Sequence, residues 1–448
     1  MNKYIEDNFE NILKDLSDLV SFNSVNSNDA LPFGKENQKV LDCMLNKMEK
    51  EGFKTKNLDY YCGYGEIGEG DKLVGILGHL DIVPAGDGWN GDPFRMEIKD
   101  GKAYGRGTTD DKGGVIAAFW ALKYLLSSGY KFKKRFRLIT GCNEEMGSAC
   151  IKHYVEKEGH IDMGFTPDAN FPGIYAEKGM LGGYVVGHNS RIIDIKGGEA
   201  TNIVSKEVKA TLPENSFDAR KLDKYFKDNH IRYELNGNKI TVYGKAAHGS
   251  RPEDGINAIS HLMMALKVSD FNDSFVDFYC KYIGLECHGE SLGYKALKDD
   301  VTDTSVNVGV IFKDGKDIKA SIDLRYPVTS SVAKALPLIE NVKDEDNEFV
   351  IGDKGGFRAV EPLYFNTDTP FVKALLAAYQ KVTGDKDSKM EAIGGGTYAK
   401  AIHNCIAFGL EWHDEDPHIH EPNEFLNLEK YKKTIEIYIE AIRNLNEI

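Results

Sequence analysis

The sequence predicts an α/β fold in which a mixed sheet, covered by helices on both faces, is interrupted by an inserted α+β domain. Two short apolar runs typical of buried strands, LVGIL (73–77) and RFRLIT (135–140), flank an apolar helix over 113–126. Strands that alternate with helices in this way indicate parallel strands covered on both faces. Near residue 182 strand pairs with glycine turns replace this alternation, which indicates the insertion.

Amphipathic helices are expected near both ends of the chain. Apolar residues at helical spacing predict helices over 7–20 and 35–51, and a terminal helix near 428–445. The α/β domain therefore resumes after the insertion. The expected boundaries are 1–181 for its first part, 182–362 for the insertion and 363–448 for its second part.

The composition is that of a soluble globular protein with an acidic balance. The chain has 448 residues, a net charge of −14 and 41% hydrophobic residues. This charge argues against nucleic acid or an anionic membrane as a partner, since both demand a cationic face. Seven scattered cysteines without a CxxC pair, and an N-terminus without a signal peptide's apolar stretch, predict a cytoplasmic location. No run of about 18 apolar residues is long enough to span a membrane.

Polar side chains follow the two predicted strands at the point where each strand ends. His79 and Asp81 stand two residues apart in GHLD, and Asn143-Glu144-Glu145 follows the second strand. Side chains two apart in an extended segment project to the same side, so the pair could serve as a ligand and its orienter. For HxD alone, a strand end with two solvated residues remains the alternative. Crevices at the carboxyl ends of parallel strands are the usual place of chemistry.

Three further stretches complete an ordered set of motifs. GRGTTDDKGG (105–114) places Asp110 and Asp111 where a helix begins, TPDANFP contains Asp168, and HIHEPNE (418–424) lies near the C-terminus. Each has a structural interpretation when taken alone; the two aspartates, for example, could be helix caps. Together the motifs read HxD, GRGxxDDKG, NEE, PD and HxxNE.

This set resembles the di-metal zinc peptidases that include glutamate carboxypeptidase, succinyl-diaminopimelate desuccinylase and carnosinase. It is most similar to the bacterial PepV-type dipeptidases, and the resemblance covers nearly the whole chain. It implies a zinc-peptidase-like fold and hydrolysis of the peptide bond in dipeptides or very short peptides. A deacylase of N-acyl amino acids is the alternative on the same fold, and a non-catalytic peptide-binding protein is disfavoured because no motif residue is missing.

The resemblance also implies roles for individual residues. Five would be metal ligands: His79, Asp110, Glu145, Asp168 and His420. Asp110 would bridge two cations, with His79 and Asp168 on the first and Glu145 and His420 on the second. Asp81 would hold the ring of His79, Glu144 would be the general base, and His418 would remain a neighbour. The bond between Asp110 and Asp111 would be a cis peptide.

The donor chemistry is consistent with these roles. Two divalent cations carry +4 and three carboxylates return −3, so a bridging hydroxide is favoured near neutral pH. Imidazole and carboxylate ligands suit zinc, while manganese and cobalt remain possible. Glu144, beside a ligand in the sequence, would take the proton and pass it to the leaving amine.

The insertion contributes a second group of candidates. GKAAHGSRPEDGINA (244–258) resembles the lid segment of these peptidases, in which His248 would stabilise the tetrahedral oxyanion. Asn202 and Arg325 resemble substrate-holding positions, and a planar guanidinium suits the substrate carboxylate. Thr397 of GGGTYA would line the same pocket. An insertion of this length, as in PepV-type enzymes, implies a monomer with a self-contained site.

Overall fold

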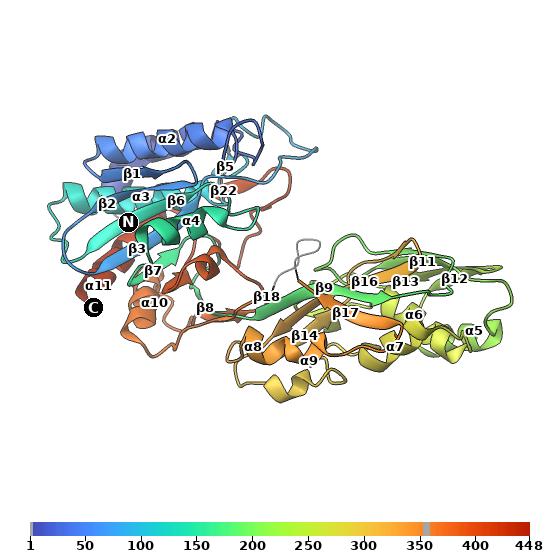
Figure 1. Ribbon diagram of the computed structural model, residues 1–448. Helices are drawn as coiled ribbons and strands as arrows, with labels where there is room; N and C mark the ends of the chain where they lie inside the picture. Colours follow the sequence, from blue (N-terminus) through green and yellow to red (C-terminus); the bar gives the residue numbers. More distant parts are fainter. Residues whose placement is uncertain (1–2, 353–358) are drawn as a thin grey trace. The chain divides into compact units, whose positions relative to one another are not determined.

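The computed structural model describes residues 3–352 and 359–448, and the chain divides into two compact units. One unit is formed by Met1–Tyr175, Phe365–Glu391 and Gly396–Ile448, and the other by Ala176–Tyr364 and Ala392–Gly395 (Figure 1). The second unit thus begins at residue 176, before the expected boundary at 182, because the chain leaves the first unit within a short strand, β8 (Ile174–Glu177).

The first unit is built on a mixed sheet whose central strands are parallel. β3 (Leu73–His79) is buried along its whole length and pairs in parallel with both β6 and β7. β7 in turn pairs in parallel with β21. The carboxyl ends of these strands therefore meet at one edge. The sheet order is β1 (Lys54–Leu58), β2 (Cys62–Ile67), β6 (Arg135–Gly141), β3, β7 (Met163–Thr166), β21 (Cys405–Ala407), β8 and β19 (Leu363–Tyr364), with β20 (Glu391–Ile393) beside β8.

The helices of this unit bury their apolar faces against the sheet and one another. α3 (Lys112–Ser127) is apolar on nearly every side, since it packs against β3 as well as against α1 and α11. The expected helices and the two expected strands are present, and the α/β fold class is confirmed. The remaining helices are α1 (Lys3–Val20), α2 (Lys35–Lys50), α4 (Ala149–Glu158), α10 (Pro370–Thr383), η3 (Tyr398–Ala401) and α11 (Leu428–Glu447).

A small antiparallel sheet joins the C-terminal part of this unit to the loop that precedes α3. β22 (Phe425–Asn427) pairs with β5 (Lys102–Tyr104), which pairs with β4 (Glu97–Lys99). Two segments far apart in the sequence are therefore fixed side by side next to Asp110.

The second unit is an antiparallel sheet with its own apolar core. Helices α5 (Ala219–Asp228), α6 (Ala258–Val268) and α7 (Ser274–Tyr282) cover one face of it (Figure 1). Short helices complete the unit: η1 (Pro252–Asp254), η2 (Tyr294–Leu297), α8 (Val332–Ala335) and α9 (Pro337–Glu340). The sheet order is β12 (Tyr233–Asn236), β13 (Lys239–Tyr243), β11 (Glu207–Thr211), β10 (Asp194–Gly197), β15 (Ile311–Asp314), β16 (Asp317–Tyr326), β9 (Gly179–Gly187) and β17 (Asn347–Ile351), with β14 (Ser305–Asn307) beside β16 and β18 (Ala359–Val360) beside β9.

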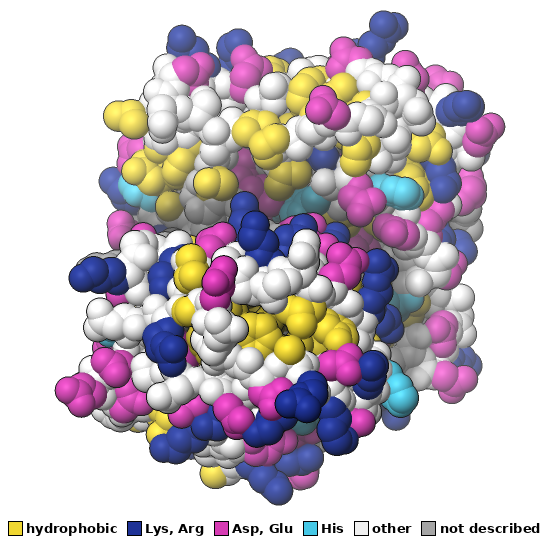
Figure 2. All heavy atoms as spheres, turned by 90° about the vertical axis from the view of Figure 1, so that its right-hand side faces the viewer, with side chains coloured by type: hydrophobic (Ala, Val, Ile, Leu, Met, Phe, Trp, Pro, Cys, Tyr) yellow, Lys and Arg dark blue, Asp and Glu magenta, His cyan; other side chains and the backbone are white. Residues whose placement is uncertain are grey.

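Charged side chains of both signs are interspersed over the face drawn in Figure 2, rather than separated into a cationic and an anionic half. Within residues 3–352 and 359–448, none of the helices has the length and apolar character needed to cross a membrane.

Candidate metal centre

The predicted ligands lie together at the carboxyl edge of the parallel strands. His79 is the last residue of β3, Glu144 and Glu145 follow β6, and Asp168 follows β7. Asp110 stands two residues before α3. The structure brings ligand atoms within 4.8 Å of one another in two groups, which are His79, Glu144 and Asp168, and His79, Asp110 and Glu145.

Asp110 occupies the centre of this cluster and presents one oxygen to each of two histidines. Its Oδ1 lies 3.0 Å from Nε2 of His79, and its Oδ2 lies 2.9 Å from Nε2 of His420. Asp168 Oδ2 is 4.0 Å from the His79 nitrogen, and Glu145 Oε1 is 3.3 Å from the His420 nitrogen. A histidine and a carboxylate thus stand on either side of a shared aspartate.

The donor set fits divalent cations. The buried Nε2 of His79 and Oε1 of Glu145 have no hydrogen-bond partner of acceptable geometry among the described residues. Buried polar atoms normally have a hydrogen-bond partner. Two atoms without such a partner, beside several carboxylates, therefore indicate a site for a cation. Imidazole and carboxylate are ligands of zinc, and carboxylates also suit manganese.

The ionisable groups of the cluster perturb one another strongly. Burial raises the pKa of Glu144 to about 7, and the neighbouring carboxylates add to this rise. The adjacent carboxylates of Asp110 and Glu145 raise the pKa of His420 to about 10. Burial would also raise the pKa of Asp110, but His420 and His79 outweigh it and lower the pKa. Such mutual perturbation is characteristic of functional sites.

Asp81 is bonded differently from what its spacing indicates. Nδ1 of His79 faces the backbone oxygen of Asp81 at 3.0 Å, while the carboxylate Oδ1 is 3.6 Å away. The carboxylate instead accepts the backbone N–H groups of Glu144 at 3.0 Å and of Glu145 at 3.2 Å. Asp81 therefore supports His79 through its backbone and fixes the NEE segment through its side chain.

Asp111 and Tyr398, to which the sequence assigned no role, also contact the cluster. The Asp110–Asp111 peptide bond is cis, as the resemblance implies. The carboxylate of Asp111 accepts the backbone N–H of His79 at 3.1 Å, and the ring of Tyr398 packs edge-on against His79 with centroids 5.8 Å apart. The imidazole of His418 faces Glu421 at 3.5 Å. The adjacent aspartates of the GRGTTDDKGG motif could have indicated a role for Asp111, whereas no motif indicated one for Tyr398.

Asn202 and His248 come together in the second unit. Ile203 forms a β-bridge with His248, and the Gly249 N–H donates to the Asn202 carbonyl at 2.7 Å. The Ser250 N–H donates to Nδ1 of His248 at 3.2 Å, so the neutral ring carries its hydrogen on Nε2. Burial and the charge of Arg325 lower the pKa of His248, which favours this neutral form. The exposed imidazole can therefore donate a hydrogen bond from Nε2.

Arg325 lies in the same unit, on β16, and is 5% exposed. Its guanidinium donates to Asp323 from Nε at 3.2 Å and from Nη2 at 2.9 Å, and to the Gly394 carbonyl from Nη1 at 2.7 Å. These bonds use three of its five N–H groups. A cavity of about 610 Å³ in this unit is lined by Lys178, His248, Ser250, Arg251 and Gly394, among others.

Thr397 lies in the first unit, where it caps a short helix. Its Oγ1 accepts the Ala399 N–H at 3.2 Å at the start of η3. η3 continues with Tyr398, the residue that packs against His79. Thr397 is therefore fixed close in the chain to a residue that contacts the metal cluster.

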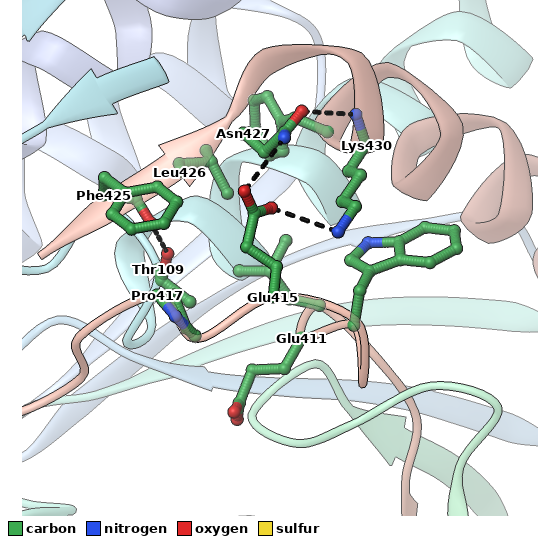
Figure 3. A pocket seen from close by; sticks show the side chains of 11 residues that line it. Thr109, Glu411, Glu415, Pro417, Phe425, Leu426, Asn427 and Lys430 are labelled. Atoms are coloured by element: carbon green, nitrogen blue, oxygen red, sulfur yellow. Dashed lines mark hydrogen bonds and ion pairs between the residues drawn. The ribbon is translucent and has the colours of Figure 1, made fainter. Parts of the chain in front are cut away.

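A small pocket of about 20 Å³ lies between the loop before α3 and the C-terminal segment. This volume holds a water molecule but no substrate. Figure 3 shows Glu415 bonded to Asn427 and Lys430, with the carboxylate of Glu411 pointing away from them. It also shows the hydroxyl of Thr109 directed at the backbone of Phe425.

Comparison with known proteins identifies the family. A model described as Peptidase family M20/M25/M40 matches residues 75–444. The chain belongs to this family. It is 33% identical over 462 residues to a Staphylococcus haemolyticus protein named "Putative dipeptidase SH1171", with 97% of each chain covered. Human carnosine dipeptidase 1 has a similar fold, with a TM-score of 0.60 at 17% identity over 100% of this chain and 98% of that one. The Bacillus subtilis YXEP protein, described as a dinuclear metal binding peptidase of the M20 family, gives a TM-score of 0.50 at 12% identity over 98% of each chain.

Proposed function

We propose that this protein hydrolyses the peptide bond of dipeptides or very short peptides with the aid of two divalent cations. The observation that carries the proposal is the position of Asp110 between two histidine–carboxylate pairs. The family, the dipeptidase names of its relatives and the dinuclear metal binding stated for the YXEP protein support it. Zinc suits the donors best, and manganese and cobalt also fit. The proposed ligands are His79, Asp110, Glu145, Asp168 and His420.

The bound cations would lower the pKa of a water molecule and polarise the scissile carbonyl. Glu144 lies within the cluster and its carboxylate is proposed as the general base, which takes a proton and returns it to the leaving amine. Asp81 fixes the backbone of Glu144, so the base is held in place by two successive N–H bonds to one carboxylate.

Residues of the second unit are proposed to act on the substrate. The Nε2–H of His248 would donate to the oxyanion that forms on the carbonyl, a role that suits a neutral donor. Asn202 and Arg325 would hold the substrate, with the two remaining guanidinium N–H groups on its carboxylate, and Thr397 would line the pocket.

We also propose that the protein is a cytoplasmic monomer. All seven cysteines are free thiols, which fits a reducing compartment. The long insertion would supply within one chain the surface that a partner subunit gives elsewhere. Sedimentation of the purified protein should give the mass of one chain, and an obligate dimer would overturn this part of the proposal.

The substrate class is tested with three compounds and added zinc, manganese or cobalt. A dipeptide should be cleaved well, and its C-terminal amide should lose about 2–5 kcal/mol in kcat/KM, because the two N–H groups of Arg325 that Asp323 and Gly394 do not engage would lose their charged partner. An N-acetylated dipeptide should be a poor substrate, since the acidic site would then meet no free amine. If the N-acetylated form is cleaved at least as fast as the free dipeptide, the protein is a deacylase of N-acyl amino acids instead.

A further inference from the structure

A buried carboxylate outside the ligand set, that of Glu424, organises the loop that carries Asp110. Glu424 is fully buried. Its Oε1 accepts the backbone N–H groups of Thr109 at 2.9 Å and of Asp110 at 3.2 Å. Its Oε2 accepts the N–H of Gly107 at 3.0 Å and Nη1 of Arg106 at 2.7 Å. Four donors from one loop of five residues thus converge on a single side chain.

The backbone around Glu424 strengthens this attachment. The Gly105 N–H donates to the Glu424 carbonyl at 3.0 Å, and the hydroxyl of Thr109 donates to the Phe425 carbonyl at 2.8 Å (Figure 3). Phe425 also pairs with Tyr104 between β22 and β5. The segments 104–110 and 424–425, more than 300 residues apart in the sequence, are therefore joined by several hydrogen bonds.

Both attached segments carry proposed metal ligands. The N–H of Asp110 is itself one of the donors to Glu424, and His420 stands four residues before Glu424. The carboxylate of Asp110 lies 2.9 Å from the ring of His420. The backbone positions from which these two ligands project are consequently set by the same carboxylate.

We propose that Glu424 is a positioning residue of the metal centre, which holds the 106–110 loop so that Asp110 faces His79 and His420 together. The inference rests on the proposed metal centre. Glu424 does not bind a cation itself, because each of its oxygens is already engaged by two N–H donors. Arg106 balances its charge and is 1% exposed.

A carboxylate is required at this position for a geometric reason. An ionised carboxylate offers about four acceptor sites, which matches the four donors. The amide of glutamine has almost the same shape but would place its NH₂ group against two N–H donors in either orientation. Glu424→Gln therefore changes the loop without changing the size of the side chain.

The test measures cobalt binding by calorimetry and the visible absorption spectrum of the cobalt-loaded protein. In Glu424→Gln we expect affinity for at least one cation to fall by about 10–100-fold, the usual scale for residues that support a metal ligand. The cobalt spectrum should change as well, since the direction of Asp110 changes. Glu66→Gln is the matched control, because it breaks the Glu66–Arg137 pair at 2.7 Å in the same unit and away from the loop. This control should lower thermal stability and leave cobalt affinity and spectrum unchanged.

The outcomes separate the inference from the proposal on which it rests. Wild-type protein that binds no cobalt would overturn the metal centre itself and the inference with it. Wild-type binding with an unchanged Glu424→Gln variant would overturn only the role of Glu424. Should Glu424→Gln fail to fold, Glu424→Asp decides, because the shorter side chain keeps the charge but cannot reach all four donors of the loop. A lower cobalt affinity and a shifted spectrum in Glu424→Asp support the inference, and wild-type values overturn it.

Discussion

The polar clusters of the two units satisfy their buried charges in opposite ways. In the first unit, His79 and Glu145 keep buried atoms without a hydrogen-bond partner among the described residues, beside several carboxylates. In the second unit, Arg325 is paired with Asp323, and Nδ1 of His248 is bonded by Ser250. We therefore expect the first cluster to need cations from outside the protein, whereas the second is balanced by the protein's own groups. This difference predicts that the first unit should respond to the addition or removal of metal and that the second unit should not.

The largest effect is expected from the group that is proposed to move a proton without binding a cation. Glu144→Gln should lower kcat for a dipeptide by about 10²–10⁴-fold, the usual contribution of a general base. Metal analysis should still find both cations. Glu145→Gln is the control and should lose metal at one site. If Glu144→Gln loses a cation and Glu145→Gln does not, the two roles are reversed.

The second test breaks the internal balance of the second unit. Arg325→Met leaves the carboxylate of Asp323 buried without its partner, which should cost about 3–5 kcal/mol of unfolding free energy. Chemical denaturation with a probe in the second unit measures this. KM for a dipeptide should also rise if Arg325 binds the substrate carboxylate. Asp323→Asn is the comparison, because it frees the guanidinium and should not raise KM.

Removal of metal should destabilise only the first unit. Free cation at 100 times its dissociation constant stabilises the folded state by about 2.7 kcal/mol, or a rise in Tm of about 5–10 °C for a unit of this size. Hydrogen exchange with and without chelator locates the effect. Peptides containing His79, Asp110 and Glu144 should lose protection on chelation, and peptides of β16 should not. Equal loss in both units would contradict the contrast between them.

The smallest effect concerns the hydroxyl that supports His248. Ser250→Ala removes the bond of 2.7 Å between Oγ and Nδ1 but keeps the backbone N–H that sets the tautomer. About 1 kcal/mol, the net value of one such bond, corresponds to a loss of about fivefold in kcat/KM. Steady-state kinetics should show this loss with metal content unchanged. A loss as large as that of His248→Ala would mean that the hydroxyl itself contacts the substrate.

The parts of the fold set by local patterns could be predicted from the sequence. The apolar runs at 73–77 and 135–140 are the cores of β3 and β6, and their parallel pairing places His79 and Glu144 at one edge. The apolar stretch at 113–126 is α3. Periodicity and strand ends carry this information, because burial acts on every turn of a helix and every second residue of a strand.

The bonding of individual carboxylates could not be predicted in the same way. HxD spacing puts Asp81 beside His79 but does not say that its side chain turns to the N–H groups after β6. Three of the four donors to Glu424 are backbone groups 314 to 317 positions away, and a backbone N–H has no signature in the sequence. Only the folded chain reveals such partners.

The order of the ligands along the chain has a consequence for synthesis on the ribosome. His79, Asp110, Glu145 and Asp168 are all made before the second unit begins, whereas His420 and Glu424 follow it. At about 5–20 residues per second, roughly 13–50 s separate Asp168 from His420. During that interval the nascent first unit carries most of its acidic cluster without the segment that closes it. With the proposed ligands, the second cation can therefore be bound only after residue 420 has been made, and a chain truncated before that residue would contain Glu145 without His420.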